Sequence, residues 1–260
     1  MITQEAPKRL KAQACPLCGQ EQDIIINGHY PYAPDPSKVQ FDPDKGYSFC
    51  NCRNIFFTDW SNMDQGEYNA EYEAKYNNEH VRNLLIRYAE EYFGEIIPRV
   101  KGRVFYEIGA VAPFLLTQAK KRGFKTYALD IIDHKFDGHV NITGDFEDPK
   151  TVEGHPRPDV IWASHVFEHF KNPIAMARRC FEIMQPGGVM FVAMPDPYLM
   201  DLKSPQLWGH WHLKEHHILW DMQSFCEMME EQGFKTVLKV RNAGYRFICI
   251  GDYHLIFQKD

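Results

Sequence analysis

The segments DVIWASHVFEHF, at residues 159–170, and MQPGGVMFV, at residues 184–192, decide the fold of this chain. Each holds a short apolar run, and the first run ends in polar residues at Ser164 and His165. Short apolar runs bounded by turn residues are typical of strands that are buried on both faces. Residues 173–184 have a helical pattern, so we predict a strand–helix–strand unit with two parallel strands.

Strands and helices alternate in both directions from this unit. The predicted strands lie at 103–108, 125–130, 235–241 and 246–258, and the predicted helices at 113–122 and 221–232. This alternation predicts an α/β fold, with a Rossmann-like, mostly parallel sheet and helices on both faces. A turn at 242–244 joins the last two strands in a predicted hairpin, which makes one edge strand antiparallel.

Composition divides the chain into three zones. Residues 1–60 are rich in Pro, Gly, Asn and Asp, with short strand-like pieces, and we predict a small zinc-binding module there. Residues 61–100 are predicted to form a helical cap or linker, because Tyr68, Tyr72 and Tyr76 recur at helical spacing. Residues 101–260 carry the alternating strands and helices.

Length and charge narrow the possible functions. The 260 residues, 44% of them hydrophobic, suit one large domain and a small module. The net charge of −6 argues against a nucleic-acid partner, which calls for a basic face. No apolar run approaches the ~20 residues of a membrane span. We expect a soluble protein of the reducing cytoplasm, with Cys180, Cys226 and Cys249 as buried thiols.

The other four cysteines form two closely spaced pairs. Cys15 and Cys18 make a CxxC followed by Gly19, and Cys50 and Cys52 make a CxC. Four thiolates in two pairs predict a tetrahedral zinc site, and the metal would stabilise a segment with little apolar mass. The alternatives are a redox pair, unmetallated thiols, or His29 as a substitute ligand for the shortened second pair.

Polar residues at the ends of the first two predicted strands of the Rossmann-like part indicate a nucleotide site. The sequence EIGAVAP at 107–113 leaves its strand through Gly109, and the next strand ends at Asp130. A carboxylate at that position can accept hydrogen bonds from ribose hydroxyls at the switch point of a doubly wound sheet. Asp145 is a candidate for an adenine amine, and Phe146 for stacking. The alternative is a turn glycine beside solvated carboxylates.

These segments resemble the class I S-adenosylmethionine-dependent methyltransferases. In that family the fourth strand typically runs "DVI…HVLEH", and "L-x-PGG" precedes the fifth, as at 159–169 and 184–188 here. The resemblance covers 101–260 and implies a seven-stranded sheet with a reversed last strand. It also implies S-adenosylmethionine as cofactor, held by Glu107, Gly109, Ala110, Asp130, Ile131, Asp145, Phe146, Ser164 and His165.

The first loop departs from the family pattern E/D-x-G-x-G-x-G. Only Gly109 is present, and Val111 and Pro113 replace the next two glycines. Glycine serves there because the backbone approaches the cofactor closely. A non-catalytic binding protein with a degenerate cofactor loop is therefore an open alternative.

A cysteine module ahead of such a domain is similar to a subgroup that includes sugar C-methyltransferases. The resemblance implies a small-molecule substrate, such as a nucleotide-linked sugar. An RNA methyltransferase is the alternative, since some ribosomal RNA methyltransferases also carry an N-terminal zinc module.

Histidines are the candidate general bases, because imidazole titrates near neutral pH. We expect His217, then His216 and His165, to face the substrate, the first two lying in a loop-like, histidine-rich stretch at 208–220. His169 is expected to pack on the following helix, and Glu168 either to be structural or to touch substrate. A metal site among these histidines lacks firm ligand spacing.

Overall fold

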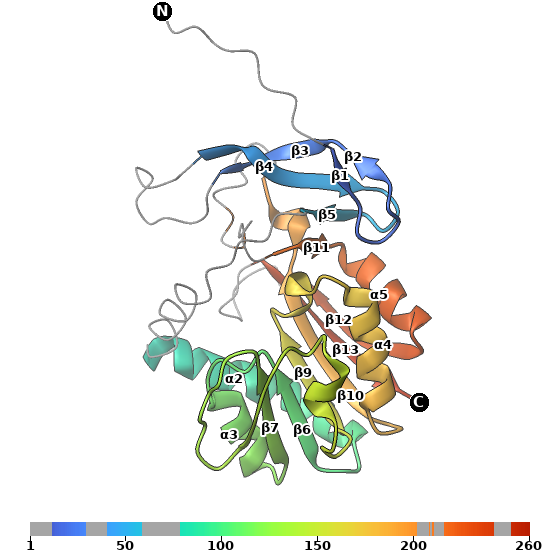
Figure 1. Ribbon diagram of the computed structural model, residues 1–260. Coiled ribbons are helices and arrows are strands. Elements are labelled where there is room, and N and C mark those ends of the chain that lie inside the picture. Colours follow the sequence, from blue (N-terminus) through green and yellow to red (C-terminus); the bar gives the residue numbers. More distant parts are fainter. Residues whose placement is uncertain are drawn as a thin grey trace, which may run out of the picture.

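The fold is built on a large twisted sheet, shown in Figure 1. The computed structural model describes residues 12–29, 41–58, 79–201, 208, 210, 216–241 and 251–260. The sheet has seven strands in the order β12-β13-β10-β9-β6-β7-β8. Their bounds are β6 (Val104–Ile108), β7 (Lys125–Asp130), β8 (Val140–Thr143), β9 (Val160–Ser164), β10 (Val189–Pro195), β12 (Phe234–Arg241) and β13 (Asp252–Lys259).

The direction of the strands confirms the predicted mostly parallel sheet with an antiparallel edge. β10, β9, β6, β7 and β8 pair in parallel. β13 runs antiparallel to both β10 and β12 and lies one place in from the edge strand β12. Parallel strands expose their carboxyl ends at one edge, and the first residues of the reversed strand β13 come to that same edge. Asp252 therefore joins the ends of β9 and β10.

Helices cover both faces of the sheet. α2 (Glu79–Ile96) and α3 (Phe114–Lys121) lie on one face, and α4 (Pro173–Ile183) and α5 (Met222–Glu231) on the other. Side-chain caps begin the second pair: Asn172 accepts from the amide of Ala175, and Asp221 from that of Ser224. Short 3-10 helices lie at Ile97–Arg99, Pro149–Val152, Phe167–His169 and Pro197–Leu199.

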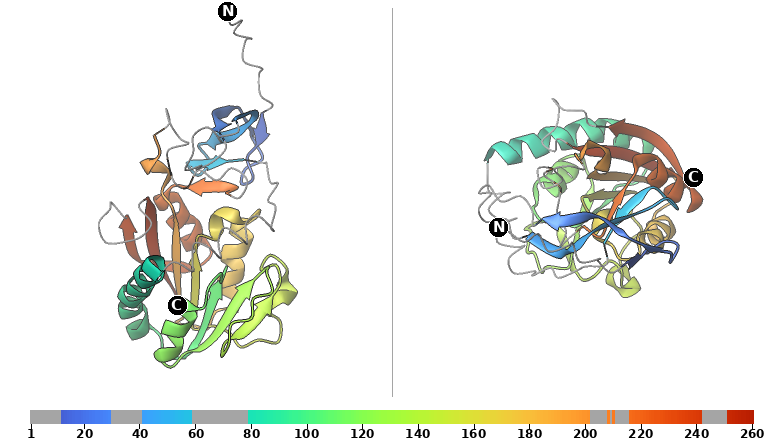
Figure 2. Two further views of the ribbon diagram at one scale, coloured as in Figure 1. Left: turned by 90° about the vertical axis from the view of Figure 1, so that its left-hand side faces the viewer. Right: turned by 90° about the horizontal axis from the view of Figure 1, so that it is seen from above.

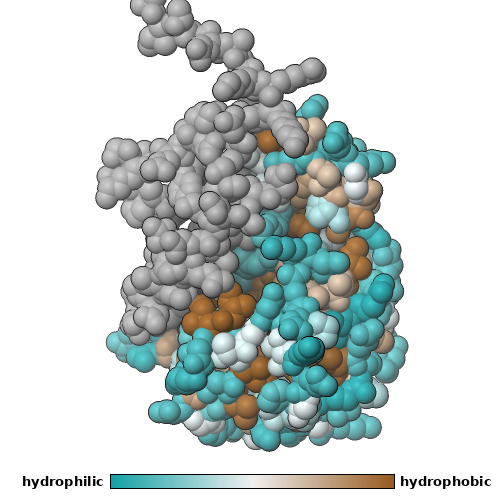
Figure 3. Space-filling model, viewed as in Figure 1, coloured by the Kyte–Doolittle hydropathy of each residue, from teal (hydrophilic) through white to brown (hydrophobic). Residues whose placement is uncertain are grey.

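The core consists of two layers separated by the sheet. Alternate residues of one strand point to opposite faces; Phe105 packs with α2 and α3, whereas Tyr106 packs on the other side. Trp162 and Phe191 stack with ring centroids 3.9 Å apart in the first layer. The coloured part of the face shown in Figure 3 is mainly hydrophilic, with hydrophobic patches between polar residues.

The N-terminal part forms a second, antiparallel assembly. β1 (Gln13–Ala14) and β2 (Glu21–Gln22) pair as a hairpin, and β3 (Ile24–His29), β4 (Phe41–Cys50) and β5 (Ile55–Phe57) form a sheet. The fourth strand of that sheet is β11 (Ile218–Trp220), which pairs with β5. Figure 2 shows this sheet packed across one end of the large one.

β11 corrects the expectation of a loop over 208–220. Ile218, Leu219 and Trp220 are buried, and their backbone groups complete the ladder of β5 instead of running over the surface. β4 also differs from expectation, because its sequence contains a Pro and a Gly and the sequence pattern predicts no strand there.

Some expectations fall outside the described residues. Tyr68, Tyr72 and Tyr76 do, as does the turn at 242–244, and the side chain of His29 is also not described. None of the helices in the described ranges combines the length and apolarity that a bilayer crossing requires.

Candidate functional site

The candidate site lies at the carboxyl edge of the large sheet, where a doubly wound fold binds its ligands. The backbone turns out of β6 at Gly109, which has a φ of +73°. A Cβ at Gly109 would lie 2.8 Å from Cγ2 of Val166, so both conformation and space call for glycine here. The amides of Gly109 and Ala110 donate to the carbonyl of Leu129, which ties this loop to β7.

Two carboxyl groups flank this turn. Asp130 ends β7 and accepts from the amide of Ile132 at 2.8 Å. Glu107 lies on the adjacent strand β6, opposite Ala128. Its Oε2 is buried without a hydrogen-bond partner among the residues that the structure describes. Burial, and then the neighbouring Asp130, raise the pKa of Glu107 well above its ordinary value, and burial also raises that of Asp130. An unpaired buried acceptor beside an open turn fits a ligand that brings hydroxyl donors.

The other expected cofactor residues differ in exposure. Ile131 is 43% exposed and directly follows the half-buried Asp130. Asp145 is exposed and accepts from the amide of Glu147. Phe146 is buried under the guanidinium of Arg179, 4.6 Å from its ring centroid, so one face of the ring is already covered. Ser164 and the loop residue Val111 are half-buried.

His165 directly follows β9 and has a φ of 54°, in the left-handed region. Among the described residues other than glycine, only Asn54 shares a positive φ. Such a backbone costs about 1–3 kcal/mol and is frequent at functional sites. Its Nε2 lies 3.1 Å from Oδ2 of Asp252, and its Nδ1 3.3 Å from Oε1 of Glu168. The ring thus stands between two buried carboxylates.

Asp252, at the start of β13, is also approached by a second histidine. Nε2 of His210 lies 3.0 Å from Oδ1 of Asp252, and the rings of His210 and His165 stack at 5.4 Å. Burial opposes the ionisation of Asp252, but the two histidines outweigh it and hold the pKa of this carboxyl far below its ordinary value.

Glu168 is surrounded by imidazoles. Nε2 of His216 lies 4.0 Å from its Oε1, and the rings of His169 and His216 meet edge to face at 4.9 Å. Nδ1 of His216 lies 3.0 Å from the carbonyl oxygen of His210, which connects the two halves of the group. We call the whole set the histidine–carboxylate cluster; it comprises His165, Glu168, His169, His210, His216 and Asp252.

The three expected bases occupy different places. His165 and His216 belong to the histidine–carboxylate cluster, and His216 is buried. His217 is half-buried beside it, with its amide donating to the carbonyl of Glu168 at 2.7 Å and its carbonyl accepting from the amide of Thr58 at 2.9 Å. Burial, then His169 and Lys171, lower the pKa of His217.

Asp252 was missed by sequence reasoning, and His210 was noted only as one histidine of a rich segment. Asp252 lay inside a predicted strand, and only the antiparallel pairing of β13 with β10 brings it beside His165. A polar residue at the start of a reversed strand is the signal that could have found it, because such a strand begins at the carboxyl edge of its parallel neighbours.

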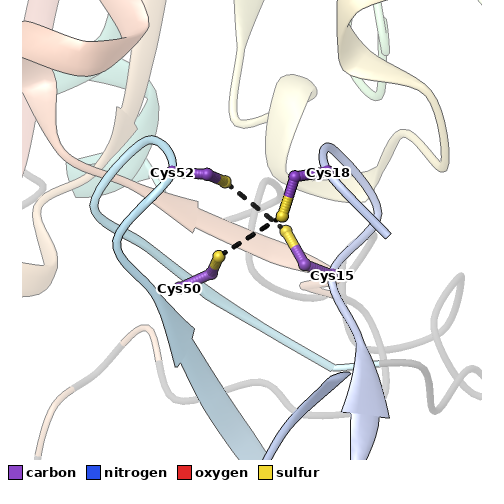
Figure 4. A group of neighbouring side chains, drawn as sticks. All are labelled: Cys15, Cys18, Cys50 and Cys52. Atoms are coloured by element: carbon purple, nitrogen blue, oxygen red, sulfur yellow. Dashed lines mark hydrogen bonds between the residues drawn. The ribbon is translucent and has the colours of Figure 1, made fainter. Parts of the chain in front are cut away.

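The predicted cysteine cluster is assembled, as Figure 4 shows, with sulfur atoms of two loops pointing toward one another. Sγ of Cys15 lies 3.6 Å from Sγ of Cys52, and Sγ of Cys18 3.6 Å from Sγ of Cys50. Tetrahedral zinc with Zn–S bonds of ~2.3 Å places its sulfurs about 3.8 Å apart. The four thiols therefore fit a zinc ion.

Comparisons with known proteins agree with this architecture. A family model described as a methyltransferase domain matches residues 78–239, well over half of the 260-residue chain. No match was found among curated proteins.

Solved structures resemble the chain across most of its length. One is a 1,6-didemethyltoxoflavin-N1-methyltransferase from Burkholderia thailandensis with bound 1,6-didemethyltoxoflavin and S-adenosylhomocysteine (TM-score 0.56, 13% identity, 88% of this chain and 99% of that one). A second is the magnesium protoporphyrin IX methyltransferase from Synechocystis with bound S-adenosylhomocysteine (TM-score 0.55, 11% identity, 76% and 95%). A third is a SAM-dependent methyltransferase from Archaeoglobus fulgidus (TM-score 0.55, 17% identity, 74% and 100%).

At these identities the likeness concerns the fold, and the match of the family model concerns descent. The chain therefore belongs to the methyltransferase domain family, and it has the fold of the class I S-adenosylmethionine-dependent methyltransferases.

Proposed function

We propose that this chain transfers a methyl group from S-adenosylmethionine to a small-molecule acceptor. The observation that carries the proposal is the arrangement of the carboxyl edge. Glu107, Gly109 and Asp130 form one half of it, and the histidine–carboxylate cluster forms the other. One half offers acceptors for ribose hydroxyls, and the other offers groups that can orient an acceptor molecule and move its proton.

In the cofactor half, Asp130 and Glu107 would accept hydrogen bonds from ribose hydroxyls, and exposed Ile131 would pack on the adenine. Ala110 and Ser164 would contribute backbone to the pocket, and Asp145 would bind the adenine amine. When bound, S-adenosylmethionine supplies an electrophilic methyl carbon that bonds to the acceptor atom, while the electron pair of the broken C–S bond stays on sulfur.

The acceptor atom must lose a proton as its new bond forms, and we assign this proton to His217. A neutral imidazole is required to receive it. Burial and the nearby His169 and Lys171 favour the neutral form of His217, and its two backbone hydrogen bonds fix it beside Glu168. His216, packed between His210 and His169, would hold this segment in place.

The acceptor is proposed to be a hydroxyl-bearing metabolite, such as a nucleotide-linked sugar. Two of the solved structures with this fold, the 1,6-didemethyltoxoflavin-N1-methyltransferase and the magnesium protoporphyrin IX methyltransferase, are named for small molecules. A small acceptor also fits the net charge of −6, which disfavours RNA.

We further propose that Cys15, Cys18, Cys50 and Cys52 hold a structural zinc ion. Four sulfur ligands leave no open position, so the role is stabilisation of the small N-terminal assembly and not chemistry. The tight turn after Cys18 fits this role, since Gly19 has a φ of +75° and its amide donates to the carbonyl of Cys15.

Calorimetric titration with S-adenosylhomocysteine tests the cofactor half. We expect wild-type binding, and a loss of about 10–100-fold in affinity for Asp130→Ala, because a charged hydrogen bond contributes roughly 1.5–3 kcal/mol. Asp133→Ala is the matched control, because Asp133 lies close by in sequence but is 59% exposed and pairs with Lys135. Absence of wild-type binding at millimolar ligand contradicts the proposal.

A further inference from the structure

Two carboxylates of the histidine–carboxylate cluster are almost completely buried. The side chains of Asp252 and Glu168 are each 1% exposed. Their ion-pair partners are all histidines, and no Lys or Arg within the described ranges pairs with either. Buried carboxylates are normally paired with a cation or coordinate a metal. The negative charge of this cluster thus lacks a permanent positive partner among the residues described.

The oxygen atoms of these carboxylates are also short of well-aligned donors. Oδ1 of Asp252 and both oxygens of Glu168 are buried without an aligned hydrogen bond in the part of the chain that the structure describes. Yet Nε2 of His210 is only 3.0 Å from Oδ1 of Asp252. A nitrogen and a carboxylate oxygen at this distance have the spacing of two ligand atoms that face a common ion.

The spacing of three of these atoms suits ligands of one ion. Ligand atoms at about 2.1 Å from a divalent metal lie about 3.0–3.4 Å from one another in octahedral or tetrahedral sites. The two nitrogens lie 3.1 and 3.0 Å from the oxygens of Asp252, and all three ligand groups lie within 4.8 Å of one another.

We propose that His165, His210 and Asp252 bind a divalent transition-metal cation at the acceptor side of the site. Two imidazoles and one carboxylate, with remaining positions open, form a ligand set that suits iron, manganese or zinc. The left-handed backbone of His165 is the strained element that aims its ring at Asp252.

Glu168 supplies the outer support that such a site needs. Metal-binding histidines almost always present their other ring nitrogen to a carboxylate or carbonyl, which fixes the tautomer. Nδ1 of His165 lies 3.3 Å from Oε1 of Glu168, while its Nε2 faces Asp252. A cation on Nε2 and a carboxylate beside Nδ1 complete a carboxylate–histidine–metal arrangement.

The cation would also narrow the acceptor class, and this step rests on the proposed methyl transfer. Contact with a divalent cation lowers the pKa of a hydroxyl group. An acceptor with a hydroxyl able to reach the open positions is therefore favoured, and His217 would receive its proton.

Titration with Mn²⁺, followed by the electron paramagnetic resonance signal of the free ion, tests the site. Manganese prefers nitrogen and oxygen ligands over a set of four thiolates, so the cysteine cluster should not compete. We expect wild-type protein to remove the free-ion signal with saturation at one ion per chain, and His210→Gln to weaken binding by at least about tenfold. His210 is 16% exposed, so its amide replacement should fold.

His155→Gln is the matched control, since His155 is exposed and lies outside the cluster, and it should bind Mn²⁺ as the wild type does. Equal affinities of wild type and His210→Gln, or no binding at millimolar Mn²⁺, would overturn the cation site. Calorimetry with S-adenosylhomocysteine on the same samples separates the two proposals. Mn²⁺ binding without cofactor binding refutes the methyltransferase and keeps the cation site, and the reverse refutes only the cation site.

Discussion

The candidate ligand atoms of the cysteine cluster lie within 4.8 Å of one another, and so do those of His165, His210 and Asp252 in the histidine–carboxylate cluster, but the two sets are assembled in opposite ways. Cys15 and Cys18 lie in the loop that joins β1 to β2, and Cys50 ends β4 just ahead of Cys52 in the loop to β5. His165, directly after β9, and Asp252, the first residue of β13, are 87 residues apart in the sequence. The first cluster is half-exposed, with Cys18 and Cys52 at the surface. In the second, Glu168, His216 and Asp252 are buried, and the other histidines are partly exposed.

This difference suits the cysteine cluster to stabilising the fold and the histidine–carboxylate cluster to a chemical role. A closed set of four thiols at hairpin loops can hold a small sheet together but leaves no place for a substrate. Imidazoles and carboxylates at the carboxyl edge keep their reactive atoms beside the cofactor half. His217 connects the N-terminal assembly to the histidine–carboxylate cluster. Its carbonyl accepts a hydrogen bond from the amide of Thr58, directly after β5, and its amide donates to the carbonyl of Glu168.

The largest effect is expected from a substitution that disrupts the cysteine cluster and leaves the histidine–carboxylate cluster unchanged. Cys18→Ser should release zinc and lower the unfolding free energy of the N-terminal assembly by more than about 5 kcal/mol, since structural zinc in small modules contributes roughly 10–16 kcal/mol. Zinc analysis and hydrogen exchange over β3–β5 measure this. Asn51→Ser, in the same loop as Cys50 and Cys52, is the control. Zinc retained at one ion per chain in Cys18→Ser contradicts the proposed ligand set.

The second-largest effect is expected at His217, which lies between the N-terminal assembly and the histidine–carboxylate cluster. His217→Asn should lower kcat by about 10²–10⁴-fold with little change in KM, because a general base acts in the transition state. Only neutral His217 is active, so wild-type kcat should fall as the pH drops through its pKa. That pKa is lowered by burial, His169 and Lys171, so the acidic limb should lie below the ordinary value of about 6.5. A limb above that value, or one retained in His217→Asn, argues for another base.

A smaller effect is expected when the histidine–carboxylate cluster is changed at Glu168, which is not one of the three proposed metal ligands. Glu168→Gln should weaken Mn²⁺ binding by about 10–100-fold, as outer-shell changes do, and should leave the zinc content unchanged. Electron paramagnetic resonance measures the Mn²⁺ affinity, and metal analysis of the same sample measures the zinc content. A loss of zinc in this variant would mean that the two clusters are not independent.

The smallest effect lies in the cofactor loop. Val111→Gly should raise the affinity for S-adenosylhomocysteine by less than about tenfold, or ~1.4 kcal/mol, because the backbone can then approach the ligand more closely. Val111→Ala keeps a Cβ but removes the branch, so its affinity for S-adenosylhomocysteine should lie between those of the wild type and Val111→Gly. New binding that appears only in Val111→Gly would instead favour the non-catalytic alternative.

Local patterns made the fold and the cysteine cluster predictable. The apolar run before His165 forms β9, and the Pro-Gly-Gly turn at 186–188 leads into β10; the two strands pair in parallel, as expected. The cysteine pairs are visible because hairpin loops keep ligands close in sequence.

The histidine–carboxylate cluster could not be predicted in the same way, because its geometry is a property of strand order. No local signal tells that Asp252 meets His165, or that residue 165 adopts a positive φ. The pairing of β11 with β5 could not be predicted for the same reason, since three residues carry too little pattern to identify a partner strand 161–165 residues earlier in the sequence.

That pairing has a consequence for the order in which the chain can fold during synthesis. β5 emerges from the ribosome long before Ile218–Trp220, so its outer edge stays open until almost the whole chain has been made. Exposed strand edges invite pairing with other chains. Zinc capture by the early cysteines would protect the nascent hairpins during this interval, and β11 would close the sheet last.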